Sequence, residues 1–152
     1  MSIHPIKESL YNFCDDYIKE RIARIQKNIQ DIQIALTSET KSSAGDKHET
    51  GRAMLQLERE KLGQQLAEAE KTTQILSKIP SKNDTSNIGL GSLVKTSKAN
   101  YYLSISAGES KIDSQSVFCI SASTPIGKLI MGKTKGDSVV FNGNTIEILE
   151  IL

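Results

Sequence analysis

A seven-residue spacing of apolar side chains constrains the fold more than any other feature of the sequence. Its members in the first of two stretches are Tyr11, Ile18, Ile22, Ile25, Ile29, Ile32 and Leu36. In the second stretch they are Leu55, Leu62, Leu66, Ala69 and Leu76. Such a repeat places one apolar seam along each of two helices. We expect an antiparallel α-helical coiled-coil hairpin over residues 1–79, with its tip at about 37–52 and arms on the order of 40 Å long.

The helical periodicity stops in a stretch rich in Pro, Gly, Ser and Asn that ends near residue 92. This composition favours turns over regular structure. Short β-prone runs follow, separated by turn residues. They are Leu93-Val94, Tyr101 to Ile105, Val117 to Ile120, Ser138 to Phe141 and Thr145 to Ile151. The sequence therefore predicts a linker at 80–92 and a small antiparallel β domain at 93–152, which makes the chain an α+β protein.

Local signals refine the β domain. Asn142-Gly143 lies between the last two β-prone runs and predicts a two-residue type I′ turn, because both central residues of that turn need positive φ. In the last run Ile146 and Ile148 alternate with polar residues, but Leu149 then falls on the other face. We therefore expect a β-bulge, or burial of both faces, near the end of the chain.

A short helix is predicted in the stretch 123–132, between the third and fourth β-prone runs. Thr124 is suited to the N-cap position, Pro125 to the first helical position and Gly132 to the position just past the helix. Three apolar residues give this helix one face to lay on the sheet. They are Ile126, Leu129 and Ile130.

Charge and cysteine content exclude several classes of protein. The 19 Lys and Arg residues are balanced by 18 Asp and Glu, so the basic surface of a duplex-binding domain is not expected. Cys14 and Cys119 lack the spacing of a metal site, which fits reduced thiols in the cytoplasm. No apolar run approaches the roughly 20 residues of a membrane span, and no signal peptide is evident. We expect a cytoplasmic protein with neither a membrane nor duplex DNA as partner.

The tip of the predicted hairpin carries two acids in the stretch Gly45-Asp46-Lys47-His48-Glu49. A rod that presents two carboxylates at its tip is suited to reaching into a partner. The same pair also resembles a capping box, in which Asp46 accepts from the third amide of the second helix and Glu49 reaches back to the Asp46 amide. From their spacing alone, both interpretations stay open.

The chain resembles the Gre family of bacterial transcript-cleavage factors. The resemblance rests on the helical hairpin with Gly-Asp-x-x-Glu at its tip, on the stretch from Thr124 to Lys133, and on Gly136-Asp137 followed by a terminal hairpin. It covers essentially the whole chain, and the sequence similarity is greatest from Ser121 to Ile151. The family implies an FKBP-like fold for the C-terminal domain and a role as a transcription elongation factor that binds RNA polymerase.

By this resemblance, the hairpin enters the secondary channel of RNA polymerase and stimulates cleavage of backtracked RNA. Asp46 and Glu49 would be auxiliary ligands of a Mg²⁺ ion shared with the polymerase, since Mg²⁺ is commonly held by one or two carboxylates together with substrate phosphates. The polymerase itself would cut the RNA, so the chain would be an accessory factor and not an enzyme. Ser123, Thr124 and Pro125 match the family's polymerase-binding loop, although helix capping explains them equally well.

The tip departs from the family pattern, in which Leu stands at the position of Lys47 and Asn at that of Thr50. Lys47 and Arg52 are candidates to contact the phosphates of the nascent RNA near its 3′ end, or to pair with the two acids. His48 is a weak candidate for a third metal ligand, because no second His or Cys lies nearby. Two alternatives therefore remain: a channel-binding regulator or inhibitor that stimulates no cleavage, and a helical-hairpin interaction protein without a polymerase role. Because the apolar seams of the two helices are expected to bury each other within one chain, we expect a monomer.

Overall fold

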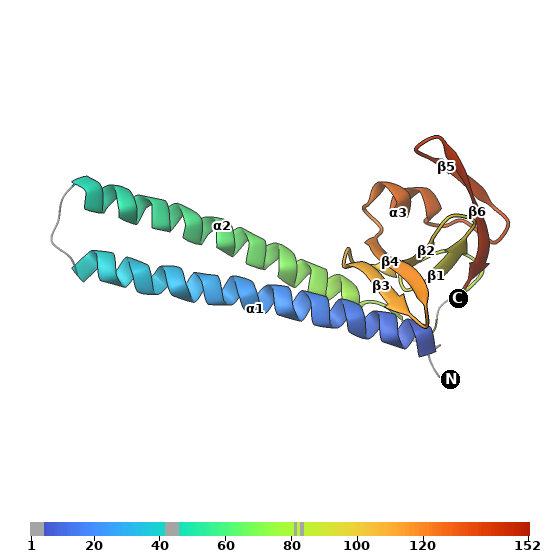
Figure 1. Ribbon diagram of the computed structural model, residues 1–152, viewed down its shortest axis with the longest axis horizontal. Helices are drawn as coiled ribbons and strands as arrows, with labels where there is room; N and C mark the ends of the chain where they lie inside the picture. The colour runs from blue at the N-terminus through green and yellow to red at the C-terminus, as the bar shows by residue number, and fades with distance from the viewer. Residues whose placement is uncertain (1–4, 42–45, 81, 83) are drawn as a thin grey trace. The chain divides into compact units, whose positions relative to one another are not determined.

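The computed structural model describes residues 5–41, 46–80, 82 and 84–152, and side chains at 39–41 and 46–48 are outside the described set. It has an α+β architecture, in which two long helices are followed by a six-stranded sheet and one short helix (Figure 1). The long helices are α1 (Pro5–Lys41) and α2 (Asp46–Ser77). The remaining elements are β1 (Leu93–Thr96), β2 (Asn100–Ser104), β3 (Gly108–Ile112), β4 (Gln115–Ser121), α3 (Pro125–Ile130), β5 (Ser138–Phe141) and β6 (Asn144–Ile151).

The chain divides into two compact units, one formed by Ile18–Thr73 and the other by the residues up to Tyr17 together with Gln74–Leu152. In the Ile18–Thr73 unit, α1 and α2 run antiparallel (Figure 1), as the heptad spacing predicts. The predicted seam is the buried side of this pair. Its fully buried members are Ile18, Ile25, Ile29, Leu62 and Ala69. Both helices continue into the range predicted for the bend, with residues 42–45 outside the described set.

The seam prediction is wrong in detail near the start of α1. Tyr11 is only partly buried, whereas Leu10 and Cys14 are fully buried. The reason is that residues up to Tyr17 belong to the unit that contains the sheet. There Cys14 Sγ lies 3.4 Å from Ser104 Oγ of β2, and Lys7 Nζ donates to the carbonyl oxygen of Leu152 at 3.1 Å. This part of α1 therefore turns a different face inward, toward the sheet.

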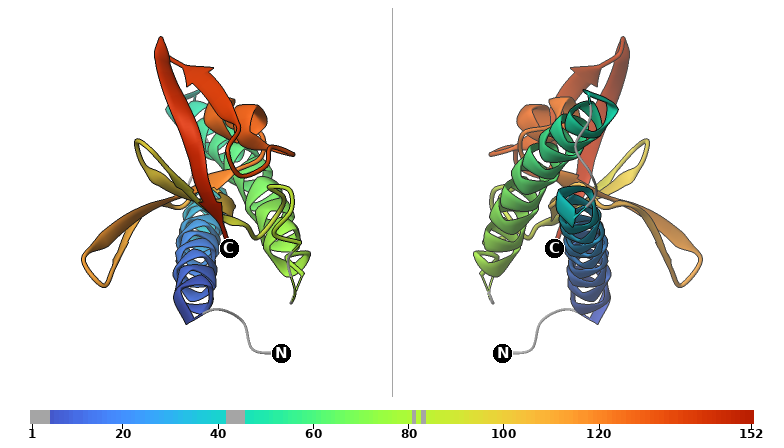
Figure 2. Two further views of the ribbon diagram at one scale, coloured as in Figure 1. Left: turned by 90° about the vertical axis from the view of Figure 1, so that its right-hand side faces the viewer. Right: turned by 90° about the vertical axis from the view of Figure 1, so that its left-hand side faces the viewer.

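The sheet has the strand order β3-β4-β2-β1-β6-β5. The prediction of a purely antiparallel sheet is wrong, because β2 and β4 pair in parallel and the other neighbours are antiparallel. The chain leaves β2, reverses into β3 at the edge of the sheet, and reverses again into β4, which inserts between β3 and β2. Two reversals restore the original direction. Figure 2 shows the β3–β4 hairpin at one side of this sheet and the β5–β6 hairpin at the other.

Strand β3 was not predicted from the sequence. Its residues are mostly polar, and only Ser110 is buried, which is typical of an edge strand. It joins β4 through Asp113 and Ser114, which have φ of 50° and 66°. Two consecutive positive φ angles match the twist of a hairpin. The turn signal was missed because Asp-Ser is a much weaker predictor of this turn than Asn-Gly.

The other local signals in the β unit are confirmed. Asn142 and Gly143 have φ of 51° and 79°, as a type I′ turn requires. The register between β1 and β6 shifts, because Lys95 pairs with Glu150 and Thr96 with Ile148. The skipped residue is Leu149, which is exposed, while the inward face resumes at Ile151. The predicted bulge therefore inserts one extra residue into β6, after which the side chains of this strand again point alternately into the core.

The main core of this unit lies between α3 and one face of the sheet. It consists of Ile88, Val94, Leu103, Ile126, Ile130, Val139, Ile146, Ile148 and Ile151. Ile88 lies within the range predicted as a linker, and its amide donates to the Lys133 carbonyl while its own carbonyl accepts from Gly132. Ile126 and Ile130 confirm the predicted apolar face of α3, but Leu129 is exposed. The short helix thus contributes two side chains to the core.

Gly127 permits a close approach between α3 and the end of β4. An added Cβ there would overlap the carbonyl oxygen of Ser121 and lie 2.8 Å from Thr124 Oγ1. Because the first of these neighbours is backbone, a rotamer change cannot relieve the overlap. The start of α3 is therefore held against β4 by the absence of a side chain at this position.

We predict that Gly127→Ala lowers the free energy of unfolding by about 1–3 kcal/mol, the range for overpacking a tight site. Urea unfolding followed by far-UV circular dichroism measures this. Gly89→Ala is a matched control, since an added Cβ there meets no atom within 4 Å. Equal stability of the two variants would contradict the packing described for α3.

Candidate functional site

The two acids predicted as the functional pair occupy the start of α2. The helix begins at Asp46, so positions 46 and 49 both lie in its first turn. Residues three apart on a helix share one face. The Glu49 side chain is exposed, whereas the side chains of Asp46, Lys47 and His48 are outside the described residues, as is Gly45. The backbone therefore places the two acid positions on one face, at the first turn of the second helix.

The electrostatics of this helix end favour negative charge. The first amides of a helix lack carbonyl partners within it, and they carry roughly half a positive charge in total. Acids at positions 46 and 49 are stabilised there, whether or not they bind a metal. The same positive end opposes the binding of a free cation. Two carboxylates at this place would thus need further ligands to hold Mg²⁺.

Within the part of the chain that the structure describes, no group of three or more His, Cys, Asp or Glu side chains is arranged to hold a metal. In a capping box Asp46 would be the residue before the first helical one, but α2 begins at Asp46 itself, so the two acids lie one position further into the helix than that motif requires. Asp46→Asn separates a hydrogen-bonding role from a metal role, because an acceptor oxygen remains while the charge that favours Mg²⁺ is lost.

The two basic candidates flank the acids. Arg52 is half-buried and already interacts with a neighbouring group. It follows Glu49 by three residues, a spacing at which oppositely charged side chains pair on a helix. The side chain of Lys47 lies outside the described residues. Contact of either residue with RNA phosphates stays a prediction.

Large apolar side chains are exposed near the same end of the hairpin, and the sequence analysis did not single them out. Ile34 on α1 and Met54 and Leu57 on α2 each have 66% of their surface exposed. Ile34 lies two residues from the seam residues Ile32 and Leu36, which is about 200° around the helix. Leu57 is placed similarly on α2, two residues from Leu55. Both helices therefore carry apolar side chains on surfaces turned away from the seam.

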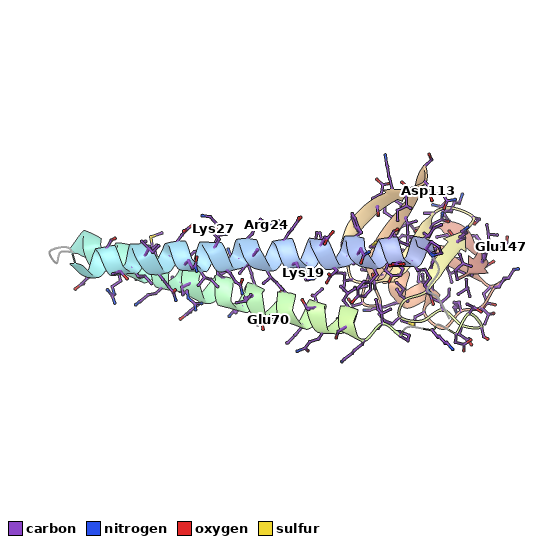
Figure 3. All side chains as sticks on the ribbon, turned by 90° about the horizontal axis from the view of Figure 1, so that it is seen from below. Lys19, Arg24, Lys27, Glu70, Asp113 and Glu147 are labelled. Atoms are coloured by element: carbon purple, nitrogen blue, oxygen red, sulfur yellow. The ribbon has the colours of Figure 1, made fainter. Side chains whose placement is uncertain are left out.

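Elsewhere in the Ile18–Thr73 unit, charged side chains occupy such outward surfaces. Lys27 on α1 pairs with Asp31 at 3.5 Å, and both side chains are more than half exposed. Figure 3 shows Arg24 and Lys27 on α1 and Glu70 on α2 pointing away from their helices. The contrast identifies Ile34, Met54 and Leu57 as a distinct group, which we call the outer apolar residues. They lie within eleven residues of the described helix ends at Lys41 and Asp46, roughly 17 Å of helix.

The predicted docking residues lie at the start of α3. Thr124 is its N-cap: Oγ1 accepts from the Gly127 amide at 3.1 Å and donates to the Ser121 carbonyl at 2.8 Å. Pro125 is the first helical residue, as predicted. Ser123 and Pro125 are exposed, and Ser123 Oγ is 2.8 Å from Ser121 Oγ. Capping therefore accounts for Thr124, while Ser123 and Pro125 present surface that a partner can contact.

The structure also brings together two cysteines that are distant in the sequence. Cys14 on α1 and Cys119 on β4 are both buried, and Cys14 Sγ lies 3.4 Å from Ser104 Oγ on β2, the strand that pairs with β4. Tyr102 lies beside them, and burial raises the pKa of its hydroxyl, with the nearby Cys14 sulfur as a second cause. Sequence spacing carries no signal for this proximity, because it arises from the packing of α1 on the sheet.

None of the described helices is long and apolar enough to cross a membrane. No family model matches the chain, and no curated protein matches it either. The functional argument therefore rests on the residues themselves.

We predict that Thr124→Ala costs about 1 kcal/mol of stability, the usual value for loss of an N-cap. Ser123→Ala should stay within about 0.5 kcal/mol of the wild type, as exposed substitutions do. Thermal or urea unfolding measures both. A larger loss for Ser123→Ala than for Thr124→Ala would contradict the capping role that the geometry assigns to Thr124.

Proposed function

We propose that the protein is a transcription elongation factor of the Gre type, which binds RNA polymerase and stimulates Mg²⁺-dependent cleavage of backtracked RNA by the polymerase. The observation that carries this proposal is the acid pair at positions 46 and 49, in the first turn of the second helix of an antiparallel hairpin. Helices of 37 and 32 residues correspond to about 55 and 48 Å of rise. A rod of this kind delivers its tip through a narrow opening.

The chemistry of the tip supports an auxiliary role and not an independent nuclease. Asp46 and Glu49 supply two carboxylates, whereas Mg²⁺ prefers six oxygen ligands and keeps several waters. The carboxylates of the polymerase and the RNA phosphates would provide the rest. The metal would then activate water and neutralise the charge that develops as the RNA bond breaks. In this scheme Lys47 and Arg52 contact the RNA near its 3′ end.

The outer apolar residues support insertion into an enclosed space. Ile34 belongs to α1, and Met54 and Leu57 belong to α2, each turned away from the seam. A flat partner would cover one side of the hairpin only. A channel wall surrounds it and can cover both, which removes these side chains from water.

The C-terminal unit would dock at the rim of the channel. Ser123 and Pro125 provide exposed surface beside α3, and we propose an FKBP-like relationship for this unit from the resemblance of its sequence to the Gre family. We further propose that the protein acts as a monomer in the cytoplasm, because its helical seam is satisfied within one chain. Duplex DNA and membranes are not among the proposed partners.

A second candidate function is supported by the basic residues beside the acids. Arg52 follows Glu49 at a pairing distance along α2, and Lys47 stands between the two acids. If these cations neutralise the acids, the hairpin would occupy the channel and regulate or inhibit the polymerase without stimulating cleavage. A third candidate, an interaction protein without a polymerase role, is separated from the first two by binding to purified RNA polymerase.

We predict that the wild-type protein stimulates RNA cleavage in stalled, backtracked elongation complexes with Mg²⁺, and that Asp46→Asn abolishes the stimulation. Asn keeps an acceptor oxygen and nearly the same shape as Asp, so this change removes the charge of the metal ligand and keeps the hydrogen-bonding capacity at the start of the helix. Gel analysis of end-labelled RNA measures the cleavage.

Asp31→Asn is the matched control, because Asp31 is an exposed acid of α1 whose pairing with Lys27 contributes little. The Asp31→Asn variant should stimulate cleavage as the wild type does.

If the wild-type protein binds the polymerase but does not stimulate cleavage, the result favours the second candidate, a channel-binding regulator or inhibitor. Absence of binding would exclude both polymerase functions.

A further inference from the structure

The pair of buried cysteines is independent of the proposed polymerase site. Cys14 and Cys119 have 0% and 2% of their surface exposed, and both belong to the unit made of the residues up to Tyr17 and Gln74–Leu152. Their positions in the chain are far apart, and α1 and β4 bring them to the same face of the sheet. Neither residue takes part in the cleavage function proposed above.

The sheet fixes the position of Cys119. In the parallel pairing of β2 with β4, Cys119 lies opposite Tyr102, and Ser104 lies two residues further along β2 on the same face. Cys14 approaches this face from α1, with its sulfur 3.4 Å from Ser104 Oγ. The two cysteines therefore lie on the same face of the sheet beside Ser104, and each influences the pKa of the other.

The surroundings give the two thiols different chemistry. The hydrogen bond from Cys119 lowers the pKa of Cys14, and bonds from the Ser104 hydroxyl and the Ile105 amide act in the same direction, while burial opposes them. The pKa of Cys119 is raised, because this thiol gives its hydrogen to Cys14 and because it is buried. A thiolate is the nucleophilic form of cysteine. Cys14 is thus the sulfur that would react first with an oxidant, and Cys119 is the sulfur that would then react with the oxidised Cys14.

We propose that Cys14 and Cys119 form a peroxide-sensitive dithiol, which closes into a disulfide between α1 and β4. The Cys14 thiolate attacks one oxygen of hydrogen peroxide, the O–O bond breaks, and hydroxide leaves to give a sulfenic acid on Cys14. The Cys119 sulfur then attacks the Cys14 sulfur and the S–O bond breaks. Water leaves with the Cys119 proton, so two thiols and one peroxide give one disulfide and two waters.

Burial selects a small oxidant. Hydrogen peroxide is close to water in size and reaches the pair through local opening of the first turns of α1, which are the end of a helix. Larger oxidants would require α1 to leave the sheet. The neighbouring Cys119 captures the sulfenic acid before a second peroxide arrives, because it lies on the face of the sheet that Cys14 approaches.

The disulfide would fasten residues 5–17 of α1 to the sheet. It would also close most of the chain into one loop, and a cross-link across a long loop restricts the unfolded state strongly. The oxidised protein should therefore unfold at a higher temperature than the reduced protein.

The experiment exposes the purified full chain to hydrogen peroxide, then denatures it, alkylates the remaining free thiols and measures its mass. We expect loss of two hydrogens, no alkylation and a raised midpoint of thermal unfolding, all reversed by dithiothreitol. Both cysteines still alkylated, oxygen retained on either sulfur, or a disulfide between two chains would each overturn the proposal.

Serine variants assign the two roles. Cys119→Ser should leave a sulfenic acid on Cys14 that dimedone traps, and Cys14→Ser should leave Cys119 unoxidised, because the pKa of Cys119 is raised by burial as well. Neither variant should gain thermal stability on exposure to peroxide. Preferential trapping of sulfenic acid on Cys119 would contradict the assigned roles.

Discussion

Burial of the heptad seam between α1 and α2 is the interaction on which the arrangement of the hairpin depends. Its residues are mostly Ile and Leu, and each such side chain contributes roughly 1.5–3 kcal/mol when fully buried. The remaining surface of the two helices is largely polar, so neither helix would be stable alone in water. The register of the seam sets which residues reach the end of the pair, and it thereby places Asp46 and Glu49 in the first turn of the second helix.

Features that depend on neighbouring residues could be predicted from the sequence, and features that depend on distant ones could not. The helices, the Asn142-Gly143 turn, the Leu149 bulge and the caps of α3 follow from local spacing and residue type. The parallel pairing of β2 with β4 is set by the order in which strands insert into the sheet. Strand β3 has too few apolar residues to be recognised, and the proximity of Cys14 to the strand that carries Cys119 arises only when α1 packs on the sheet.

The same distinction applies to the candidate site. The positions of the two acids were predictable, because a helix start has a local signature in the sequence. The outer apolar residues were not identified, since they interrupt a polar surface and belong to no repeat. A complete metal site could not be predicted from this chain, because two carboxylates are too few for Mg²⁺ and the other ligands would belong to the partner. The capping role of Thr124 followed from Thr-Pro, whereas the partner surface beside it has no such signature.

The most direct test of the central claim is to map where the hairpin tip lies in a backtracked elongation complex. Iron–EDTA attached to Ala53→Cys on α2 would generate hydroxyl radicals near the tip, and Cys14 and Cys119 are buried and would not take the label. Ala67→Cys is the control, because it is exposed, occupies the same heptad position and lies about 21 Å further along the helix. The account predicts cleavage of the RNA near its 3′ end by the probe at 53 and none by the probe at 67. Equal cleavage by both probes, or none by either, would contradict it.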